Sequence, residues 1–248
     1  MTDVLIGDYD MTSVVHNDTY PAIDPAKANL IGKAVFISGA SRGLGRAMSV
    51  SFAKSGASYI AIGARSDLSA TIKEMREASG AAGKPEPKVL PVQFDVTNRH
   101  SVEKAVTAVK DAFGRIDIVI NNAGVLTAGK IADADPDEWW RTFQVNLVGP
   151  YLLTRGFIPL MLEAGGDKTF VTVSSVGAHL RSPGLSAYQT SKLAVLRFTE
   201  FVGADYGDRG VLAYAIHPGN IPTDMLGDAG EISPELRAGE YIHYIHTY

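Results

Sequence analysis

Short apolar runs alternate with longer helical patterns over most of this chain of 248 residues. The runs are apolar on both faces, as in strands that helices cover on both sides. Such alternation favours a parallel, doubly wound α/β sheet, and the length fits a single domain. Six strands are predicted, at Ala34–Ser38, Tyr59–Ile62, Val89–Phe94, Ile116–Asn121, Thr169–Ser174 and Val211–Ile216. Five helices are predicted between them, at Leu44–Lys54, Leu68–Ala78, Ser101–Phe113, Asp137–Leu162 and Ala187–Tyr206.

Composition excludes several classes of protein. Apolar residues make up 46% and charged residues 20%, which is ordinary for a soluble globular chain. The chain has no cysteine, so disulfides, thiolate nucleophiles and cysteine-ligated metals are excluded. A net charge of −4 argues against nucleic-acid binding, and no apolar run reaches the roughly 18 residues of a membrane span. The acidic N-terminus does not resemble a secretory signal, so a cytoplasmic location is expected.

The first predicted strand ends in a glycine-rich turn that opens directly into a helix. Its glycines are Gly39, Gly43 and Gly45, with the spacing G-x-x-x-G-x-G. Backbone N–H groups and the positive end of the helix dipole at such a turn suit a phosphate or pyrophosphate. The spacing differs from the commoner G-x-G-x-x-G fingerprint, so a tight turn without a ligand is the alternative interpretation.

The second predicted strand is followed by a cation where many dinucleotide-binding folds carry an acid. Counting twenty residues from Gly45 reaches Arg65, whereas the nearest acid, Asp67, lies beyond the strand. An acid at this point holds the adenosine ribose, and an arginine pairs with a 2′-phosphate. Together with Arg42 in the glycine turn, Arg65 therefore predicts NADP(H) rather than NAD(H). An ordinary surface cation is the alternative interpretation of Arg65.

Tyr188 and Lys192 stand four residues apart within a helical stretch. That spacing places both side chains on one face of a helix. An ammonium group near a tyrosine favours the phenolate and lowers the phenol pKa from about 10. The pair therefore suits proton transfer, although the same spacing is also common on solvated helices.

Two further polar residues point to the same edge of the predicted sheet. Ser175 follows the fifth strand, at the carboxyl edge where open α/β sheets bind ligands. A hydroxyl there can hydrogen-bond a substrate carbonyl beside the tyrosine. Asn146 lies in an apolar helix, where an amide satisfies backbone groups or holds a water or a carbonyl.

Taken in order, these motifs resemble those of the short-chain dehydrogenase/reductase family, over roughly residues 33 to 225. The ordered set comprises the glycine turn, Asp95-Val96, Asn121-Asn-Ala-Gly124, Asn146, Ser175, Tyr188, Lys192 and Pro218-Gly-Asn-Ile-Pro-Thr223. The resemblance implies a Rossmann-like fold and an NADP(H)-dependent oxidoreductase that interconverts a carbonyl and a secondary alcohol. It also implies a small-molecule substrate and a homodimer or homotetramer.

The resemblance assigns catalytic roles to four residues. Tyr188 would be the general acid in reduction, and Lys192 would lower its pKa and bind the nicotinamide ribose. Ser175 would orient the carbonyl, and Asn146 would help to hold a water of a proton relay. The hydride chemistry itself belongs to the cofactor.

The resemblance also implies a set of residues that contact the cofactor. Asp95 and Val96 would lie against the adenine, Ile221 would meet the nicotinamide carboxamide, and Thr223 its amide or the pyrophosphate. The full set is Gly39, Ser41, Arg42, Gly43, Leu44, Gly45, Arg65, Asp95, Val96, Asn122, Ala123, Gly124, Tyr188, Lys192, Pro218, Gly219, Ile221 and Thr223.

Both ends of the chain depart from the family pattern. Residues 1–32 contain prolines and turn formers and are predicted to form an N-terminal arm before the domain at 33–225. The family continues beyond Thr223 with a further helix and a seventh strand. In the short segment 226–248 this last helix–strand unit is predicted to be missing or replaced. Its absence would leave the sixth strand near an open sheet edge and weaken the cover over the substrate.

Two other functions remain open from the sequence. One is an NAD-dependent alcohol dehydrogenase, for which Arg65 is the discriminating residue. The other is a cofactor-binding protein without turnover, which the short C-terminal segment favours.

The substrate pocket is expected between 125–130, 176–185 and the segment after Thr223. No metal site is predicted, because His243 and His246 lack a third ligand. Apolar stripes on the helices with Asn146 and Tyr188 would either cover the sheet or form a subunit interface.

Overall fold

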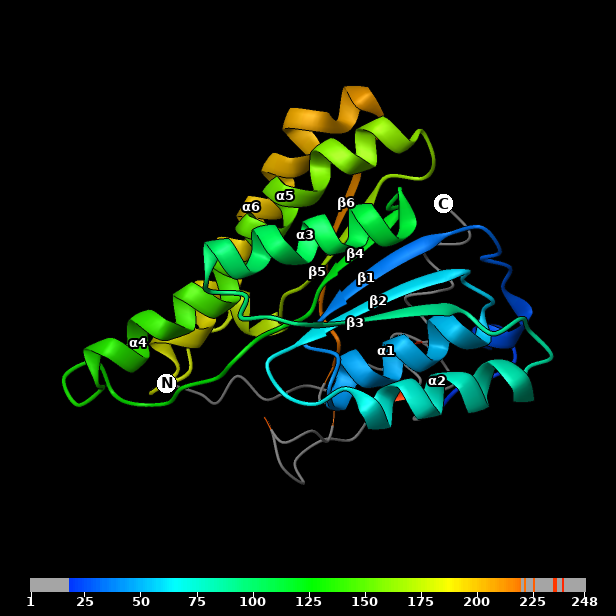
Figure 1. Cartoon of the computed structure of the whole chain (residues 1–248). Coiled ribbons are helices and arrows are strands. Elements are labelled where there is room, and N and C mark those ends of the chain that lie inside the picture. Colours follow the sequence, from blue (N-terminus) through cyan, green and yellow to red (C-terminus); the bar gives the residue numbers. More distant parts are fainter. Residues whose placement is uncertain (1–17, 220, 222–224, 226–233, 236–237, 239–248) are drawn as a thin grey trace.

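The computed structural model is built around one sheet of six parallel strands (Figure 1). It describes residues 18–219 together with 221, 225, 234, 235 and 238. The strands are β1 (Ala34–Ser38), β2 (Tyr59–Ala64), β3 (Lys88–Gln93), β4 (Ile118–Asn121), β5 (Thr169–Val173) and β6 (Leu212–Ile216). Their order is β3-β2-β1-β4-β5-β6, and every neighbouring pair is parallel. The predicted single-domain, doubly wound α/β fold is confirmed.

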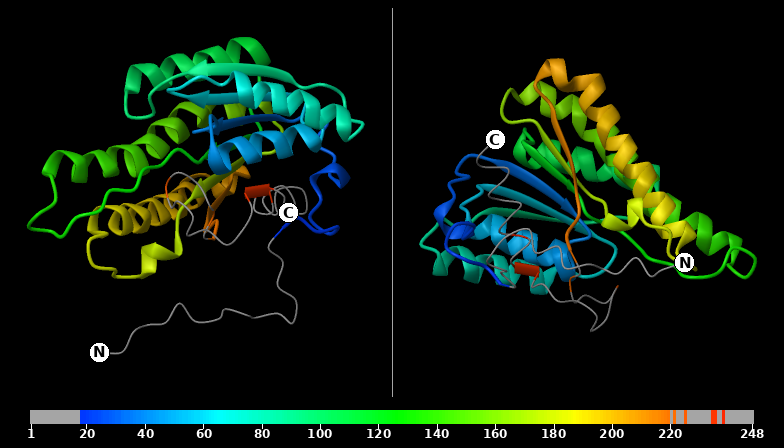
Figure 2. Two further views of the ribbon diagram at one scale, coloured as in Figure 1. Left: turned by 90° about the horizontal axis from the view of Figure 1, so that it is seen from below. Right: turned by 180° about the vertical axis from the view of Figure 1, so that it is seen from behind.

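Helices cover both faces of the sheet. One face carries α1 (Gly43–Lys54) and α2 (Ser69–Ala81), and the other carries α3 (Arg99–Phe113), α5 (Gly149–Ala164) and α6 (Ser186–Tyr206) (Figures 1 and 2). The short helix α4 (Pro136–Phe143) projects beyond the end of the sheet (Figure 1). Short helical turns lie at η1 (Pro25–Lys27), η3 (Val176–His179) and η4 (Gly207–Arg209).

The central strand β1 is buried on both faces, as its unbroken apolar sequence requires. Because successive side chains of a strand point to opposite faces, Val35 and Ile37 pack into the layer under α1 and α2. Phe36 packs into the other layer, where its ring centroid lies 5.8 Å from that of Phe94 and 4.8 Å from that of Phe157. These two apolar layers hold the carboxyl ends of the strands in a fixed arrangement.

The single helix predicted at 137–162 is in fact interrupted. It begins after Asp135, whose side chain accepts hydrogen bonds from the N–H groups of Asp137 (2.8 Å) and Glu138 (3.3 Å). After α4 the backbone forms a π-helical segment, η2 (Gln144–Val148), before α5 continues. Such π segments are often found at functional sites, and this one contains Asn146. Apolar periodicity does not distinguish π from α geometry, so the interruption could not be predicted from the apolar pattern.

The combined helix Pro136–Ala164 is long and apolar enough to cross a membrane, judged by length and composition alone. In the structure, 56% of its most apolar window is buried. Leu153 and Phe157 are fully buried in the layer that covers the sheet. This is the environment of a core helix, which explains the apolar composition.

The described part of the predicted N-terminal arm stays outside the sheet but packs against the domain. The Leu30 N–H donates to the Ser55 carbonyl at the end of α1 (2.9 Å), and Ile23, Ala28 and Leu30 are buried. The predicted loss of the last helix–strand unit concerns residues that lie almost entirely outside the described part of the chain.

Candidate active site

A cavity of about 900 Å³ lies at the carboxyl ends of the strands. Its walls come from the loops after β1, β2, β3, β4, β5 and β6 and from α4 and α6. The cavity therefore includes the point between β1 and β4 where the strand order reverses. Ligands of open α/β sheets bind at such switch points.

The glycine turn forms one wall of the cavity and is tightly packed. Gly39 and Gly43 have φ values of +71° and +53°, which favour glycine. A Cβ atom at Gly45 would collide with the Gly39 carbonyl and the Asn122 amide. Because α1 begins at Gly43 without a side-chain cap from the preceding residue, its first N–H groups suit an anion such as a pyrophosphate.

Ser38 fixes the glycine turn to the loop after β4. Its hydroxyl accepts hydrogen bonds from the N–H groups of Asn122 (3.0 Å) and Ala123 (3.1 Å) and donates to the Ile120 carbonyl (3.2 Å). The Asn122 amide in turn donates to the Ser38 carbonyl (2.9 Å) and the Gly39 carbonyl (3.2 Å). Ser38 was not predicted as a site residue, although a hydroxyl that ends an otherwise apolar strand was a usable signal.

The loops after β2 and β3 form another end of the cavity, where Arg65 and Asp95 both line the wall. The Asp95 carboxylate accepts hydrogen bonds from the Thr97 N–H and hydroxyl, both 2.8 Å long. Burial alone would raise the pKa of Asp95, but the Thr97 hydrogen bonds and the charges of Arg65 and Arg141 outweigh it and leave the pKa below its ordinary value. This end of the cavity therefore carries both signs of charge: the Asp95 carboxylate and the cations of Arg65 and Arg141.

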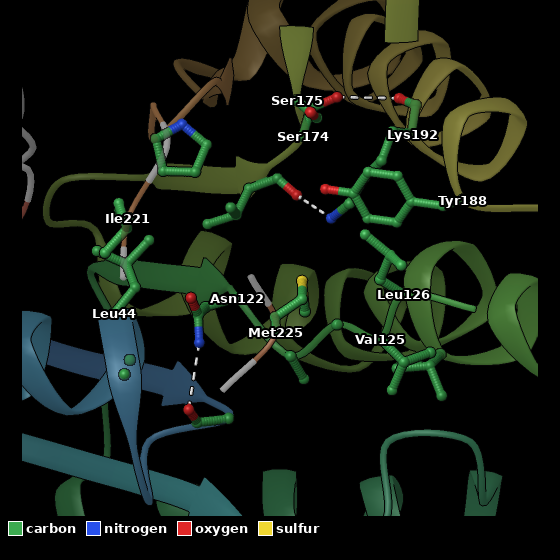
Figure 3. A pocket seen from close by; sticks show the side chains of 18 of the residues that line it. Leu44, Asn122, Val125, Leu126, Ser174, Ser175, Tyr188, Lys192, Ile221 and Met225 are labelled. Atoms are coloured by element: carbon green, nitrogen blue, oxygen red, sulfur yellow. Dashed lines mark hydrogen bonds between the residues drawn. The ribbon is translucent and has the colours of Figure 1, made fainter. Parts of the chain in front are cut away.

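Ser175, Tyr188 and Lys192 come together on one side of the cavity, with Leu44 and Ile221 on the other (Figure 3). The Ser175 hydroxyl is near enough to Tyr188 to lower the pKa of its phenol. The Ser175 hydroxyl also accepts the Gly177 N–H at 3.0 Å, which fixes the serine at the start of η3. Ser175 follows β5 and Tyr188 lies in α6, and both side chains line the same cavity.

Lys192 is buried below the tyrosine. Its ammonium nitrogen lies 5.7 Å from the centroid of the Tyr188 ring and donates to the Val173 carbonyl at 2.7 Å. The Ser174 hydroxyl donates to the Lys192 carbonyl at 2.9 Å. These backbone contacts at the end of β5 hold the lysine in place, and sequence spacing alone did not reveal them.

The pKa of Tyr188 shifts in the direction opposite to the sequence prediction. Burial raises the pKa, and the polar Ser175 hydroxyl nearby lowers it by less. Burial also lowers the pKa of Lys192 to about 8. At neutral pH the phenol is thus protonated and most of the lysine still carries its charge. A protonated phenol is the form that a general acid requires.

Asn146 does not line the cavity but supports its wall. Its amide nitrogen donates to the Val125 carbonyl (2.9 Å) and the Ser191 hydroxyl (3.0 Å), so both amide hydrogens are used. Its oxygen accepts the Val125 N–H at 2.9 Å. Gly124 lies next to that oxygen: a Cβ there would be in van der Waals contact, 3.4 Å from the Asn146 oxygen and 3.6 Å from the Lys192 nitrogen. Asn146 can therefore bind a water only by accepting a hydrogen bond at its amide oxygen.

The part of the cavity beside Tyr188 is mainly apolar. The predicted pocket segments contribute Val125, Leu126, Thr127, Val176, Gly177, Leu180, Ser182 and Leu185. Gln189, which no sequence motif identified, accepts the Ser182 N–H at 2.8 Å and donates to the Ser182 hydroxyl at 3.1 Å. The buried glutamine thereby fixes the loop between η3 and α6 against the active site.

Every described residue predicted to contact a cofactor lines this cavity, while Thr223 lies outside the described residues. The positions span the glycine turn, the loops after β2, β3 and β4, and the pair Tyr188 and Lys192. Among the described residues, no three histidine or acidic side chains gather as metal ligands. His243 and His246 fall outside that part of the chain.

Comparison with known proteins agrees with this geometry. Residues 33–232 match the family model described as short chain dehydrogenase. The chain is 58% identical over 228 residues to the short chain dehydrogenase pigC of Monascus ruber, covering 92% of this chain and 75% of that protein. A mutant of the Serratia marcescens short-chain dehydrogenase/reductase has a TM-score of 0.77 at 28% identity, covering 88% of this chain and 91% of its own. Carveol dehydrogenase from Mycobacterium avium in complex with NAD shares the fold, with a TM-score of 0.78 at 21% identity and coverage of 89% and 92%.

Proposed function

The chain belongs to the short-chain dehydrogenase family of oxidoreductases, and we propose that it interconverts a carbonyl group and a secondary alcohol with NADP(H). One observation carries the proposal: the Ser175–Tyr188–Lys192 cluster faces the same cavity as the glycine turn. A dinucleotide with its pyrophosphate at the start of α1 has room to extend along the strand ends to Tyr188.

Each residue of the Ser175–Tyr188–Lys192 cluster has a separate role in carbonyl reduction. The bound cofactor supplies the hydride. Tyr188, kept protonated by burial, donates its phenolic proton to the substrate oxygen. Ser175 hydrogen-bonds the same oxygen and fixes the carbonyl beside the phenol. The Lys192 ammonium, 5.7 Å from the centroid of the Tyr188 ring, stabilises the phenolate that forms.

The cofactor preference rests on the cations at the adenosine end of the cavity. Arg65 follows the strand whose end meets the adenosine ribose in dinucleotide folds, and Arg42 lines the same cavity from the glycine turn. Two guanidinium groups there favour the 2′-phosphate of NADP(H). NAD is bound by carveol dehydrogenase, but that relative shares only the fold.

Steady-state kinetics with both cofactors test this preference. Wild type should have a Michaelis constant at least about tenfold lower for NADPH than for NADH. Arg65→Ala should raise the constant for NADPH and leave that for NADH nearly unchanged. Arg197→Ala, which removes an exposed arginine of α6 paired with Glu200, is the matched control. A wild-type preference for NADH would overturn the NADP(H) assignment.

We also propose a cytoplasmic homodimer or homotetramer. Tyr151, Leu193 and Phe201 on α5 and α6 are 46%, 48% and 59% exposed, which is unusual for large apolar side chains. Light scattering during gel filtration tests the assembly, and a monomer at micromolar concentration would contradict it.

A further inference from the structure

Arg141 lines the cavity from α4, although no motif in the sequence pointed to it. Glu138, Arg141 and Val145 are spaced three and four residues apart, so they share one face of the helical segment, and all three line the cavity. One turn further on, Gly149 packs so closely on Val96 that a Cβ atom would collide with the valine side chain. This helix face therefore begins on Val96 and continues outward along the cavity.

The sheet order places the adenine end of a dinucleotide under that same face. The pyrophosphate belongs at the start of α1, and the ribose belongs at the end of β2. Because β3 lies beyond β2 in the sheet, the base reaches the loop that follows β3, where Asp95 and Val96 line the wall. Arg141 is near enough to Asp95 for its charge to lower the pKa of that carboxyl.

The Arg141 guanidinium is held at the rim of the cavity. One of its nitrogens lies 3.1 Å from the Glu138 carboxylate one turn earlier, and its side chain is 38% exposed. Asp95, the acid that lines the cavity after β3, already accepts two hydrogen bonds from Thr97. Arg141 is thus oriented by its own helix and keeps a planar, weakly hydrated cation beside the expected position of the base.

We propose that Arg141 covers the adenine ring of the bound dinucleotide, with its guanidinium plane stacked on the base and Glu138 orienting it. The inference rests on the proposed dinucleotide-binding function. It differs from the role of Arg65, because adenine is common to NADPH and NADH whereas the 2′-phosphate is not. Arg141 is therefore a determinant of overall cofactor affinity, and Arg65 is a determinant of the choice between the two cofactors.

Direct binding measurements separate the two roles without any substrate. Dissociation constants for NADPH and NADH are measured by calorimetry for wild type, Arg141→Met, Arg65→Ala and the control Arg197→Met. Methionine keeps an apolar stem and removes the planar cation. Arg141→Met should raise both dissociation constants by the same factor, about tenfold. Arg65→Ala should raise only the dissociation constant for NADPH, and Arg197→Met should change neither dissociation constant.

Fragments of the cofactor locate the contact. Arg141→Met should weaken binding of ADP-ribose and leave reduced nicotinamide mononucleotide unchanged. Arg141→Lys, which keeps the charge but not the plane, provides a milder variant and should weaken ADP-ribose by a smaller factor.

The outcomes separate this inference from the proposed function. Wild-type affinity of Arg141→Met for both dinucleotides would overturn the adenine contact and leave the proposed function standing. Weakening of NADPH alone would overturn it as well, because the residue would then contact the 2′-phosphate. If wild type binds neither dinucleotide, the proposed function fails and the adenine contact fails with it.

Discussion

The side chain of Asn146 binds both backbone groups of Val125: it accepts the N–H and donates to the carbonyl, and both hydrogen bonds are 2.9 Å long. Val125 follows the Asn122–Gly124 turn at the end of β4, so this pair joins the π-helical segment to the wall of the cavity. Asn146 is 1% exposed, and water cannot replace it as a partner for the two Val125 groups. A polar residue in an apolar helix is explained here by the backbone that it satisfies.

Replacing Asn146 by alanine should therefore destabilise the fold. Two backbone groups would lose a partner, and a buried unsatisfied group costs about 1–3 kcal/mol. We expect the free energy of unfolding from urea titration to fall by at least about 2 kcal/mol. Asn29→Ala is the matched control, since the Asn29 amide oxygen accepts the Ile31 N–H in an exposed position. Equal losses for the two variants would contradict this account of Asn146.

The glycine turn should tolerate no side chain at Gly45. Gly45→Ala places a Cβ against the Gly39 carbonyl and the Asn122 amide, so the turn and the loop after β4 must move apart. We expect a loss of about 1–3 kcal/mol in the free energy of unfolding and at least tenfold weaker NADPH binding.

Gly80→Ala provides the comparison for this substitution. Gly80 lies in α2 with open space around it, so alanine there should leave NADPH binding unchanged and raise stability by up to about 1 kcal/mol. A Gly45→Ala protein that binds NADPH as wild type does would show that close packing of the turn is not required.

The depressed pKa of Lys192 should appear in the pH dependence of stability. Below pH 8 both the folded and the unfolded chain carry the charge, so the cost of burying it is present in full. Between the folded pKa of about 8 and the ordinary value of 10.5 the unfolded state binds more protons, and stability rises with pH.

Urea titrations of wild type and Lys192→Met at pH 7.5 and pH 10 measure this effect. From the lower to the higher pH the free energy of unfolding of wild type should rise relative to that of the variant, by up to about 3 kcal/mol. Titrations of other groups cancel in the difference. A difference between the two proteins that does not change with pH would contradict the depressed pKa.

Much of this fold was predictable because its signals are local. The apolar run Ala34–Ser38 has the predicted bounds in the structure, and the other strands shift by at most two residues at either end. The cavity also brings together residues that were identified from motifs far apart in the chain, from Gly39 to Ile221. Parallel strands bring such positions together because all their carboxyl ends meet at one edge.

Other features depend on contacts that spacing does not encode. The pKa of Tyr188 was predicted to fall because Lys192 is near, but burial dominates and raises it. The Val173 carbonyl, which binds the lysine, has no side-chain signature in the sequence. Arg141 of α4 lines the cavity, and Gly149 at the start of α5 packs on Val96 after β3; a helical pattern alone shows neither contact.

The central claim is that Tyr188 transfers the proton during NADPH-dependent carbonyl reduction, and Tyr188→Phe tests it most directly. NADPH oxidation is followed at saturating cofactor with a ketone that wild type accepts, and NADPH binding is measured separately. Tyr151→Phe, on the outer face of α5, is the control. We predict that Tyr188→Phe lowers kcat by at least about 100-fold while the protein still binds NADPH. Turnover of the ketone by Tyr188→Phe at the wild-type rate would contradict the account.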